Sequence, residues 1–367
     1  MAKNDYYVIQ GEDYRQMAIR ILQAADLAAD IGDKKKRIGI KPNILGAQKA
    51  SAGAVTHPEL VDGCLTYLKE EGFANLVVLE GSWVGDRTSQ AVRVSGVYDV
   101  CNRHQVPFVD LQKDSFQTLD AAGMPISVCD EALRLDYLIN LPVLKGHCQT
   151  TVTCALKNSK GLIPNSEKRR FHTLGLHKPI AHLNTVVHQN FILLDNICGD
   201  LDFEEGGNPV VMNRVLGFWD PVLCDSFAAE SMGYSPRDIA YIRLAEQLGV
   251  GSAQVSDANR ISLNEGVLDT DPVPMHSTRR ISRLAAYASA KDACSACYGS
   301  LIYALDRLND EGKLSGHKMG SIAIGQGCRG KTGDLGIGQC TSCFAKNLGG
   351  CPPKAVDIVE FLREFWE

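Results

Sequence analysis

The sequence lacks any long apolar run. No stretch of its 367 residues approaches the roughly 20 consecutive apolar residues that span a bilayer. The N-terminal stretch MAKNDYYVIQGEDYRQ also has no apolar core of the signal-peptide type. These two absences predict a cytoplasmic protein without a membrane partner. Thiols stay reduced in that compartment and disulfides are rare there.

The chain also lacks a strong excess of charge of either sign. Its formal net charge is −5 at pH 7, which is mild for this length. Proteins that bind nucleic acid usually carry a basic patch or a large positive charge, so we expect no nucleic-acid partner. Hydrophobic residues make up 45% of the chain and charged residues 22%, as in ordinary globular proteins. A sizeable core is therefore expected without disulfide staples.

Strand-like and helix-like segments alternate from residue 37 to about residue 250. The helical pattern of HPELVDGCLTYLKEEG lies between the short apolar runs RIGIKPN and NLVVLEGS. Further apolar runs that predict strands are VPFVDL, LDYLINLPVL, FILLDNI and PVLCDS. Apolar strands that alternate with helices are typical of a mostly parallel sheet covered on both faces. We therefore predict an α/β fold with a doubly wound, mostly parallel sheet.

A polar segment with two prolines, SLNEGVLDTDPVPMHSTRR, interrupts this pattern. Such a composition is typical of a linker or domain edge. It predicts an α/β domain over residues 1–265 and a smaller, cysteine-rich C-terminal α/β region over residues 266–367.

The 13 cysteines are unevenly spread, because six of them lie in the last 74 residues. An odd number of cysteines in a reducing compartment argues against a disulfide framework. The cysteines that occur singly among apolar neighbours are predicted to be small buried residues; they are Cys64, Cys101, Cys129, Cys154, Cys198 and Cys224.

The C-terminal cysteines have the spacing of metal ligands. Cys294 and Cys297 form one C-x-x-C pair at a predicted helix start, and Cys340 and Cys343 form another in a glycine-rich loop. Cys351 precedes two prolines at the start of the last helix, whose positive end lowers a thiol pKa. Zinc and a 4Fe–4S cluster both take four thiolates. The proline after the last cysteine and the surrounding glycines favour the 4Fe–4S cluster, with zinc as the alternative.

This spacing resembles the proximal-cluster segment of hydrogenase small subunits and of the related complex I subunit. In those proteins a C-x-x-C pair, a later G-x-C and a final G-C-P-P supply the ligands. The resemblance implies the metal ligands Cys294, Cys297, Cys340 and Cys351. Cys328 and Cys343 are then spare, or one of them replaces a member of the four.

A neighbouring stretch, GQGCRGKT at residues 325–332, matches the phosphate-loop pattern. That motif requires a helix directly after its lysine and threonine, and here GDLGIGQC follows instead. We therefore predict that these glycines surround the metal site and do not bind a nucleotide.

Polar residues follow several predicted strands of the α/β domain, where ligands bind in open α/β sheets. In the segment LINLPVLKGHCQTTVTCALKNSKGLIP they predict the catalytic residues Lys145, His147, Lys157 and Asn158. Lysines near acids suit an anionic substrate such as a carboxylate or phosphate, and a histidine among them could move a proton. Further polar residues at strand ends or before helices are predicted to bind a cofactor; they are Lys41, Asn43, His57, Glu80, Asp195 and Asp225.

The ordered motifs KPN, TH, LEGS, LPVLKGH, ALKNSKGLIP and LLDNI resemble the domain-of-unknown-function family DUF362 over roughly residues 37 to 250. The resemblance implies an α/β fold and an association with iron–sulfur clusters. The large domain of that family is distantly similar to the N-terminal domain of nickel-pincer lactate racemases, but the cofactor motifs of the racemases do not map onto this chain. The resemblance implies no reaction.

Three functions therefore stay open from the sequence. The first is an iron–sulfur oxidoreductase or electron-transfer protein that acts on a small anionic molecule or with a redox partner protein. The second is a non-redox isomerase or lyase whose cluster or zinc is structural. The third is a metal-stabilised binding protein without chemistry.

Overall fold

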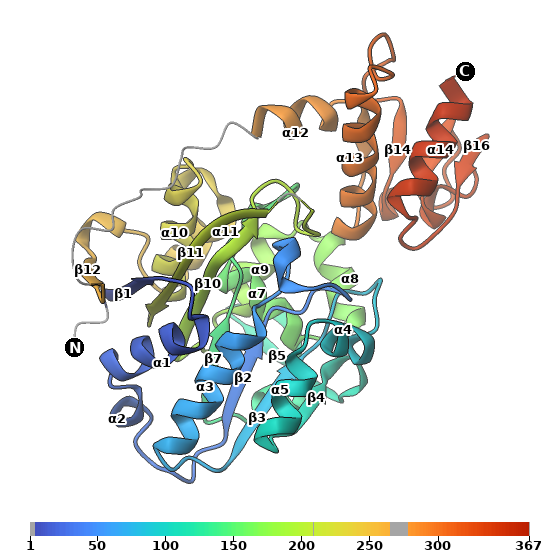
Figure 1. Cartoon of the computed structure of the whole chain (residues 1–367). Helices are drawn as coiled ribbons and strands as arrows, with labels where there is room; N and C mark the ends of the chain where they lie inside the picture. The colour runs from blue at the N-terminus through green and yellow to red at the C-terminus, as the bar shows by residue number, and fades with distance from the viewer. Residues whose placement is uncertain (1–3, 208, 265–277, 367) are drawn as a thin grey trace. The chain divides into compact units, whose positions relative to one another are not determined.

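The structure is a computed structural model that describes residues 4–207, 209–264 and 278–366 (Figure 1). Its contacts divide the chain into two compact units. The first unit comprises Met1–Lys168 and His177–Pro274, and the second comprises Arg169–Leu176 and Met275–Glu367. The domain boundary predicted after residue 265 lies outside the described residues.

The first unit is built on a mostly parallel sheet, which confirms the predicted fold class. Of the strand pairs in this sheet, only β1 with β11 and β10 with β11 are antiparallel. Within the described residues the sheet has eight strands; in spatial order they are β12 (Asn259–Ser262), β1 (Asp5–Gln10), β11 (Pro209–Phe218), β10 (Phe191–Asp200), β7 (Tyr137–Leu141), β2 (Ile38–Pro42), β3 (Leu76–Glu80) and β4 (Phe108–Asp110).

Helices cover this sheet because its central strands are apolar on both faces. Every residue of β2, β3, β7 and β10 is buried. One face packs in a single core with the helices α1 (Tyr14–Ala24), α2 (Leu27–Ile31), α3 (Pro58–Glu70), α4 (Thr88–Val94) and α5 (Val97–His104). Other helices of the unit are α6 (Asp130–Leu133), α7 (Ala155–Asn158), α9 (His177–Leu183), α10 (Pro221–Ser231) and α11 (Ala240–Gln247). α7 contacts β7, and α10 contacts β10 and β11.

One predicted strand is wrong, because PVLCDS at residues 221–226 begins helix α10. Asp220 caps this helix by accepting hydrogen bonds from the backbone N–H groups of Val222 and Leu223, and Pro221 occupies its first turn. A short apolar run does not distinguish a buried strand from a buried helix. The cap and the proline were the signals for a helix start.

Two small hairpins and a connecting helix complete the elements near the sheet. The hairpins are β5 (Phe116–Ala121) with β6 (Met124–Cys129) and β8 (Lys145–His147) with β9 (Thr151–Thr153). Helix α8 (Asn165–Thr173) runs from the first unit into the second. β8 follows the carboxyl end of β7 directly, so it places its side chains at that edge of the sheet.

The second unit contains a four-stranded sheet in which every neighbouring pair is parallel. Its strands, in spatial order, are β13 (Ala288–Ala290), β14 (Ile322–Ile324), β15 (Leu335–Ile337) and β16 (Lys346–Leu348). Its helices are α12 (Thr278–Ala285), α13 (Ser295–Asp310) and α14 (Ala355–Trp366), drawn in orange to red in Figure 1. Throughout the described part of the chain, no helix is both long and apolar enough to cross a bilayer.

Candidate functional site

A buried ion pair stands at the carboxyl ends of β2 and β3. Lys41 Nζ lies 2.9 Å from Glu80 Oε2, and neither side chain is more than 3% exposed. The two strands are parallel neighbours, so their ends bring these residues together. Gly161 is required at this point, because a Cβ there would lie 1.9 Å from Glu80 Oε1 and 2.6 Å from Lys41 Nζ. The glycine of the NSKG motif therefore lets the backbone pass directly over the ion pair.

Asn158 joins this pair to other predicted site residues. Its Oδ1 accepts hydrogen bonds from Lys41 Nζ at 3.1 Å and from Asn43 Nδ2 at 2.7 Å. Asn43 Oδ1 in turn accepts a hydrogen bond from Lys145 Nζ at 2.9 Å. Five of the residues singled out in the sequence therefore form one buried hydrogen-bond network.

His147 and Lys157 join the network through a residue that the sequence analysis did not single out, Glu204. The Glu204 carboxylate accepts a hydrogen bond from His147 Nε2 at 2.9 Å and forms an ion pair with Lys157 Nζ. Its backbone oxygen accepts a hydrogen bond from Lys145 Nζ at 3.2 Å. The available signal was the acidic pair Glu204–Glu205, which follows shortly after the apolar run FILLDNI.

The protonation of His147 is fixed by the backbone. Its Nδ1 accepts hydrogen bonds from the N–H groups of Gln149 at 2.9 Å and Thr150 at 3.0 Å. The ring proton therefore resides on Nε2, which donates to Glu204. Burial, followed by the charge of Lys157, lowers the pKa of His147 to about 4. His147 is thus a neutral hydrogen-bond donor at pH 7.

Burial shapes the charges of the remaining groups in this network. It lowers the pKa of Lys145 to about 8. Burial alone would raise the pKa of Glu204, but Lys157 and the hydrogen bond from His147 hold it well below its usual range. Burial and the charge of Glu204 raise the pKa of the adjacent Glu205 to about 7. A group that titrates near neutral pH therefore lies beside the ionised Glu204.

The His147 contact predicts a specific pH dependence of stability. The unfolded chain binds a proton at His147 below pH 6.5 and the folded chain only near pH 4, so this residue destabilises the fold progressively as the pH falls between these values. The variant for comparison is His147→Gln, whose amide can also accept a hydrogen bond from backbone N–H groups and donate one to Glu204. The advantage of the wild type in unfolding free energy should shrink by about 3 kcal/mol between pH 6.5 and pH 4.

Urea unfolding followed by tryptophan fluorescence at a series of pH values measures this difference. The comparison with the variant is needed because Glu205 and Asp225 have raised pKa values in the folded chain. These two carboxyl groups increase the free energy of unfolding as the pH falls through the same range, which is opposite to the effect of His147. A difference between the two proteins that stays constant from pH 6.5 to pH 4 would contradict the assignment of a neutral His147.

The other residues predicted to bind a cofactor occupy different positions. His57 and Asp195 form a pair of their own, with Nδ1 of the histidine 2.9 Å from Oδ2 of the aspartate. Asp225 lies inside α10, where its carboxylate accepts hydrogen bonds from Leu156 N at 3.0 Å and from the Tyr241 hydroxyl at 2.8 Å. Its neighbours there include the thiols of Cys154 and Cys224. Asp225 therefore belongs to a different group of contacting residues from Lys41 and Glu80.

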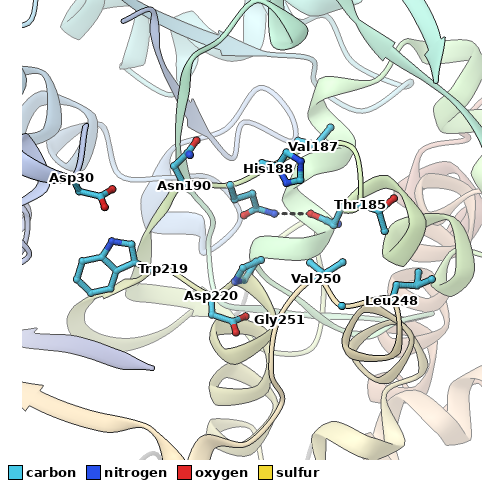
Figure 2. A pocket seen from close by; sticks show the side chains of 14 residues that line it. Asp30, Thr185, Val187, His188, Asn190, Trp219, Asp220, Leu248, Val250 and Gly251 are labelled. Carbon is cyan, nitrogen blue, oxygen red and sulfur yellow. Dashed lines mark hydrogen bonds between the residues drawn. The ribbon is translucent and has the colours of Figure 1, made fainter. Parts of the chain in front are cut away.

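A hollow opens near Asn190, directly before the amino end of β10 (Figure 2). Its volume is about 570 Å³, and Asp30, His188 and Trp219 are among its lining residues. Gln189, which also lines it, accepts a hydrogen bond from Asn140 Nδ2 at 2.6 Å. Asn140 Oδ1 accepts one from Asn158 Nδ2 at 2.7 Å. A chain of amide side chains therefore connects the hollow with the buried network.

In the second unit, a cysteine follows each strand of the parallel sheet within four residues; these are Cys294, Cys328, Cys340 and Cys351. After β14 and β15 the chain repeats one local structure, a glycine with positive φ followed by a 3-10 turn. The glycines are Gly325 at 115° and Gly338 at 93°. Each copy of this structure is only a few residues long, which is too short to form a recognisable repeat in the sequence. Parallel strands with equivalent turns deliver their cysteines to the same edge of the sheet.

The four predicted metal ligands lie in one neighbourhood. A Cβ at Gly338, two residues before Cys340, would lie 3.9 Å from Cys297 Sγ. Burial raises the pKa of Cys297 to about 12, and the charges of Cys294, Cys351 and Cys340 contribute to the increase. Cationic and amide groups face these sulfur atoms. Arg329 Nε donates to Cys340 Sγ at 3.4 Å, and Gln326 Nε2 donates to Cys294 Sγ at 3.5 Å.

The two spare cysteines differ in their surroundings. Cys343 is exposed. Cys328 is buried, and the charges that act on it are those of Lys291, Lys331, Cys340 and Asp292. The residues after Lys331 and Thr332 lead into β15 and form no helix, as predicted for this apparent phosphate loop.

The six cysteines predicted to be buried are all buried. Four of them, Cys129, Cys154, Cys198 and Cys224, have polar contacts as well as apolar ones. The sulfur atoms of Cys154 and Cys224 are 3.6 Å apart, and Cys198 Sγ lies 3.8 Å from His57 Nε2. All 13 cysteines are free thiols.

Comparison with known proteins finds a match to a family described as "Domain of unknown function (DUF362)", over residues 38–230. A curated relative is a thylakoid-associated protein of Synechocystis sp., which is 26% identical over 136 residues. That match covers 37% of this chain and 42% of the relative, so the chain spans less than half of the relative's length.

Two solved structures show a weaker likeness. One is the lactate racemase apoprotein from Thermoanaerobacterium thermosaccharolyticum, with 16% identity and a TM-score of 0.38 over 52% of this chain and 50% of that one. The other is a protein from Thermotoga maritima, with 16% identity and a TM-score of 0.41 over 65% of this chain and 60% of that one.

Proposed function

The chain belongs to the DUF362 family, and from this premise and the gathered cysteines of its second unit we propose that it is an iron–sulfur protein that acts in electron transfer or as an oxidoreductase. One 4Fe–4S cluster would be held by Cys294, Cys297, Cys340 and Cys351. When bound, it would supply one-electron transfer. The observation that carries the proposal is that these four thiols, up to 57 positions apart in the sequence, lie in one neighbourhood.

The sulfur atoms are not drawn together as in a closed four-thiolate zinc site. Four thiolates on one zinc lie ~3.8 Å apart, given tetrahedral geometry and the usual zinc–sulfur bond length. In the described part of the second unit, no three of these sulfur atoms lie mutually within 4.8 Å. A four-iron core occupies the space between its ligands and holds them further apart.

The surroundings also fit an anionic cluster. Arg329 and Gln326 direct N–H groups at two of the sulfur atoms. Such hydrogen bonds stabilise thiolates and tune the reduction potential of a cluster. Glycines beside Cys340 and Cys351 leave room for the backbone to approach the cluster closely.

In the first unit, the residues that we propose to bind substrate are Lys145, His147, Lys157 and Asn158. Four buried ammonium groups, those of Lys41, Lys145, Lys157 and Lys168, gather here, and their acidic neighbours are Glu80, Glu204, Glu205 and Asp110. Lysines beside acids suit a small carboxylate or phosphate. His147 would act by holding the Glu204 carboxylate through its Nε2 hydrogen bond, and Lys157 would supply the countercharge of the anion.

The test is the iron, sulfide and zinc content of protein purified without oxygen, together with its visible absorption and a redox titration. About four irons and four sulfides per chain with a reversible couple would support the proposal. Bound iron without a reversible couple would favour a structural cluster in a non-redox enzyme. Stoichiometric zinc without colour would overturn the iron–sulfur assignment.

A further inference from the structure

A second reactive group lies in the first unit, away from the lysines and the C-terminal cysteines. Cys198 Sγ lies 3.8 Å from His57 Nε2, and His57 Nδ1 lies 2.9 Å from Asp195 Oδ2. The three side chains thus stand in the order thiol, imidazole and carboxylate. This is the arrangement in which a base activates a nucleophile and a third group orients the base.

The carboxylate and the imidazole are held firmly in place. Asp195 is fully buried, and its oxygens accept hydrogen bonds from the backbone N–H groups of His57 at 2.8 Å and Ile197 at 3.1 Å. The Tyr14 and His57 rings pack edge-on, with their centroids 5.5 Å apart. The Tyr14 hydroxyl donates a hydrogen bond to Asn213 Oδ1 at 2.8 Å. His57 therefore donates from Nδ1 to Asp195 and keeps Nε2 available toward the thiol.

An irregularity in the sheet accompanies the position of Cys198. In a regular strand, residues three apart point to opposite faces, so Asp195 and Cys198 could not both contact His57. The pairing of β10 with β11 shifts between Asn196 and Cys198, whose partners Arg214 and Val211 are three residues apart. β11 therefore carries an extra residue here. The irregularity lies directly beside Cys198, and bulges are frequent beside active sites.

We propose that Cys198, His57 and Asp195 form a nucleophilic site that accepts an acyl group from an ester or thioester. The Cys198 thiol gives its proton to solvent beside the protonated His57, and Cys198 Sγ forms a bond to the carbonyl carbon. The bond between that carbon and the leaving oxygen or sulfur breaks, and the leaving group takes the proton from His57. Water then hydrolyses the acyl-cysteine to a carboxylic acid and restores the thiol. This activity goes beyond the proposed electron transfer and uses none of its residues.

The choice of an acyl donor follows from the role of His57. Burial alone would lower the pKa of His57, but the charge of Asp195 and the hydrogen bonds to Asp195 and Cys198 raise it to about 10. His57 is therefore protonated at pH 7. A protonated imidazole that gives its proton to the departing atom suits a reaction that expels a leaving group.

The test exposes the anaerobically purified full-length protein to p-nitrophenyl acetate at pH 7 and locates the acetyl groups by peptide mass spectrometry. Cys343 is the internal control, since it is exposed whereas Cys198 is only 5% exposed. We expect Cys198 to be acetylated about tenfold faster than Cys343, or more, because the neighbouring His57 imidazolium favours a thiolate and can protonate the leaving group. His57→Gln should slow the acetylation of Cys198 by about 100-fold while the circular dichroism spectrum stays unchanged.

Faster acetylation of Cys343 than of Cys198 in the wild-type protein would overturn the proposal, and this comparison requires no variant to fold. Iodoacetamide serves as a second probe that carries no acyl group. If Cys198 reacts rapidly with iodoacetamide and not with p-nitrophenyl acetate, the thiol is activated but the acyl assignment is wrong.

Discussion

Replacing Cys351 with alanine should reduce the iron content of anaerobically purified protein from about four atoms per chain to near zero. Cys351 follows the last strand of the C-terminal sheet and precedes α14, whose N-terminal end carries partial positive charge. Its charge acts on the half-buried Cys297. Its loss would leave three thiolates for a four-iron core, which is then readily lost. Iron and sulfide analysis with the visible spectrum measures the effect.

Cys343→Ala is the matched control for this experiment. It removes a thiol from the same glycine-rich region, but Cys343 is exposed and is not among the charges that act on Cys297. Its iron content should therefore equal that of the wild type. Full iron retention in Cys351→Ala, or loss of iron in Cys343→Ala, would show that the ligand set is wrong. Cys328, which lies beside Cys340, would be the next ligand to test.

The second large effect is expected from Glu80→Gln in the first unit. This substitution keeps the size of the side chain but removes the negative partner of Lys41, whose ammonium group is fully buried. Burial already lowers the pKa of Lys41, and Glu80 opposes that effect. Breaking a buried ion pair by removing one partner typically destabilises a fold by about 3 to 5 kcal/mol.

Urea unfolding followed by tryptophan fluorescence measures this loss, because Trp83 and Trp219 both lie in the first unit. The control is Lys113→Gln, which breaks the pair between Lys113 and Asp110 at 3.5 Å, where the lysine side chain is 74% exposed. That variant should stay within about 0.5 kcal/mol of the wild type. Equal unfolding midpoints for Glu80→Gln and the wild type would mean that Lys41 is neutral in the fold and that the ion pair contributes nothing.

Much of the first unit could be predicted from the sequence because its strands are buried on both faces. Such strands appear as short apolar runs, and the runs around Ile40, Val78 and Ile139 became β2, β3 and β7. The same property explains the error at PVLCDS, since a helix buried all round, such as α10, is equally apolar. The strands β8, β13 and β16 are only three residues long and give too short a pattern to be recognised.

The candidate site was predictable where polar residues directly follow strands. Lys41, Glu80 and Lys145 were found in this way, because the carboxyl ends of parallel strands share one edge. Glu204 was missed because it follows a strand that runs well past this edge, so its contact with His147 depends on the path of the chain after β10.

The sequence by itself determined the α/β class, the burial of the single cysteines and the residue types available for an anion and a metal, because periodicity and spacing are local properties of the chain. Only the tertiary structure decided which of those residues meet. It joined Lys41, Lys145 and Lys157 into one network through Asn158 and Glu204, and it separated Asp225 from them. It also placed Cys198 against His57, since contacts between residues 141 positions apart depend on strand register and bulges that no local pattern encodes.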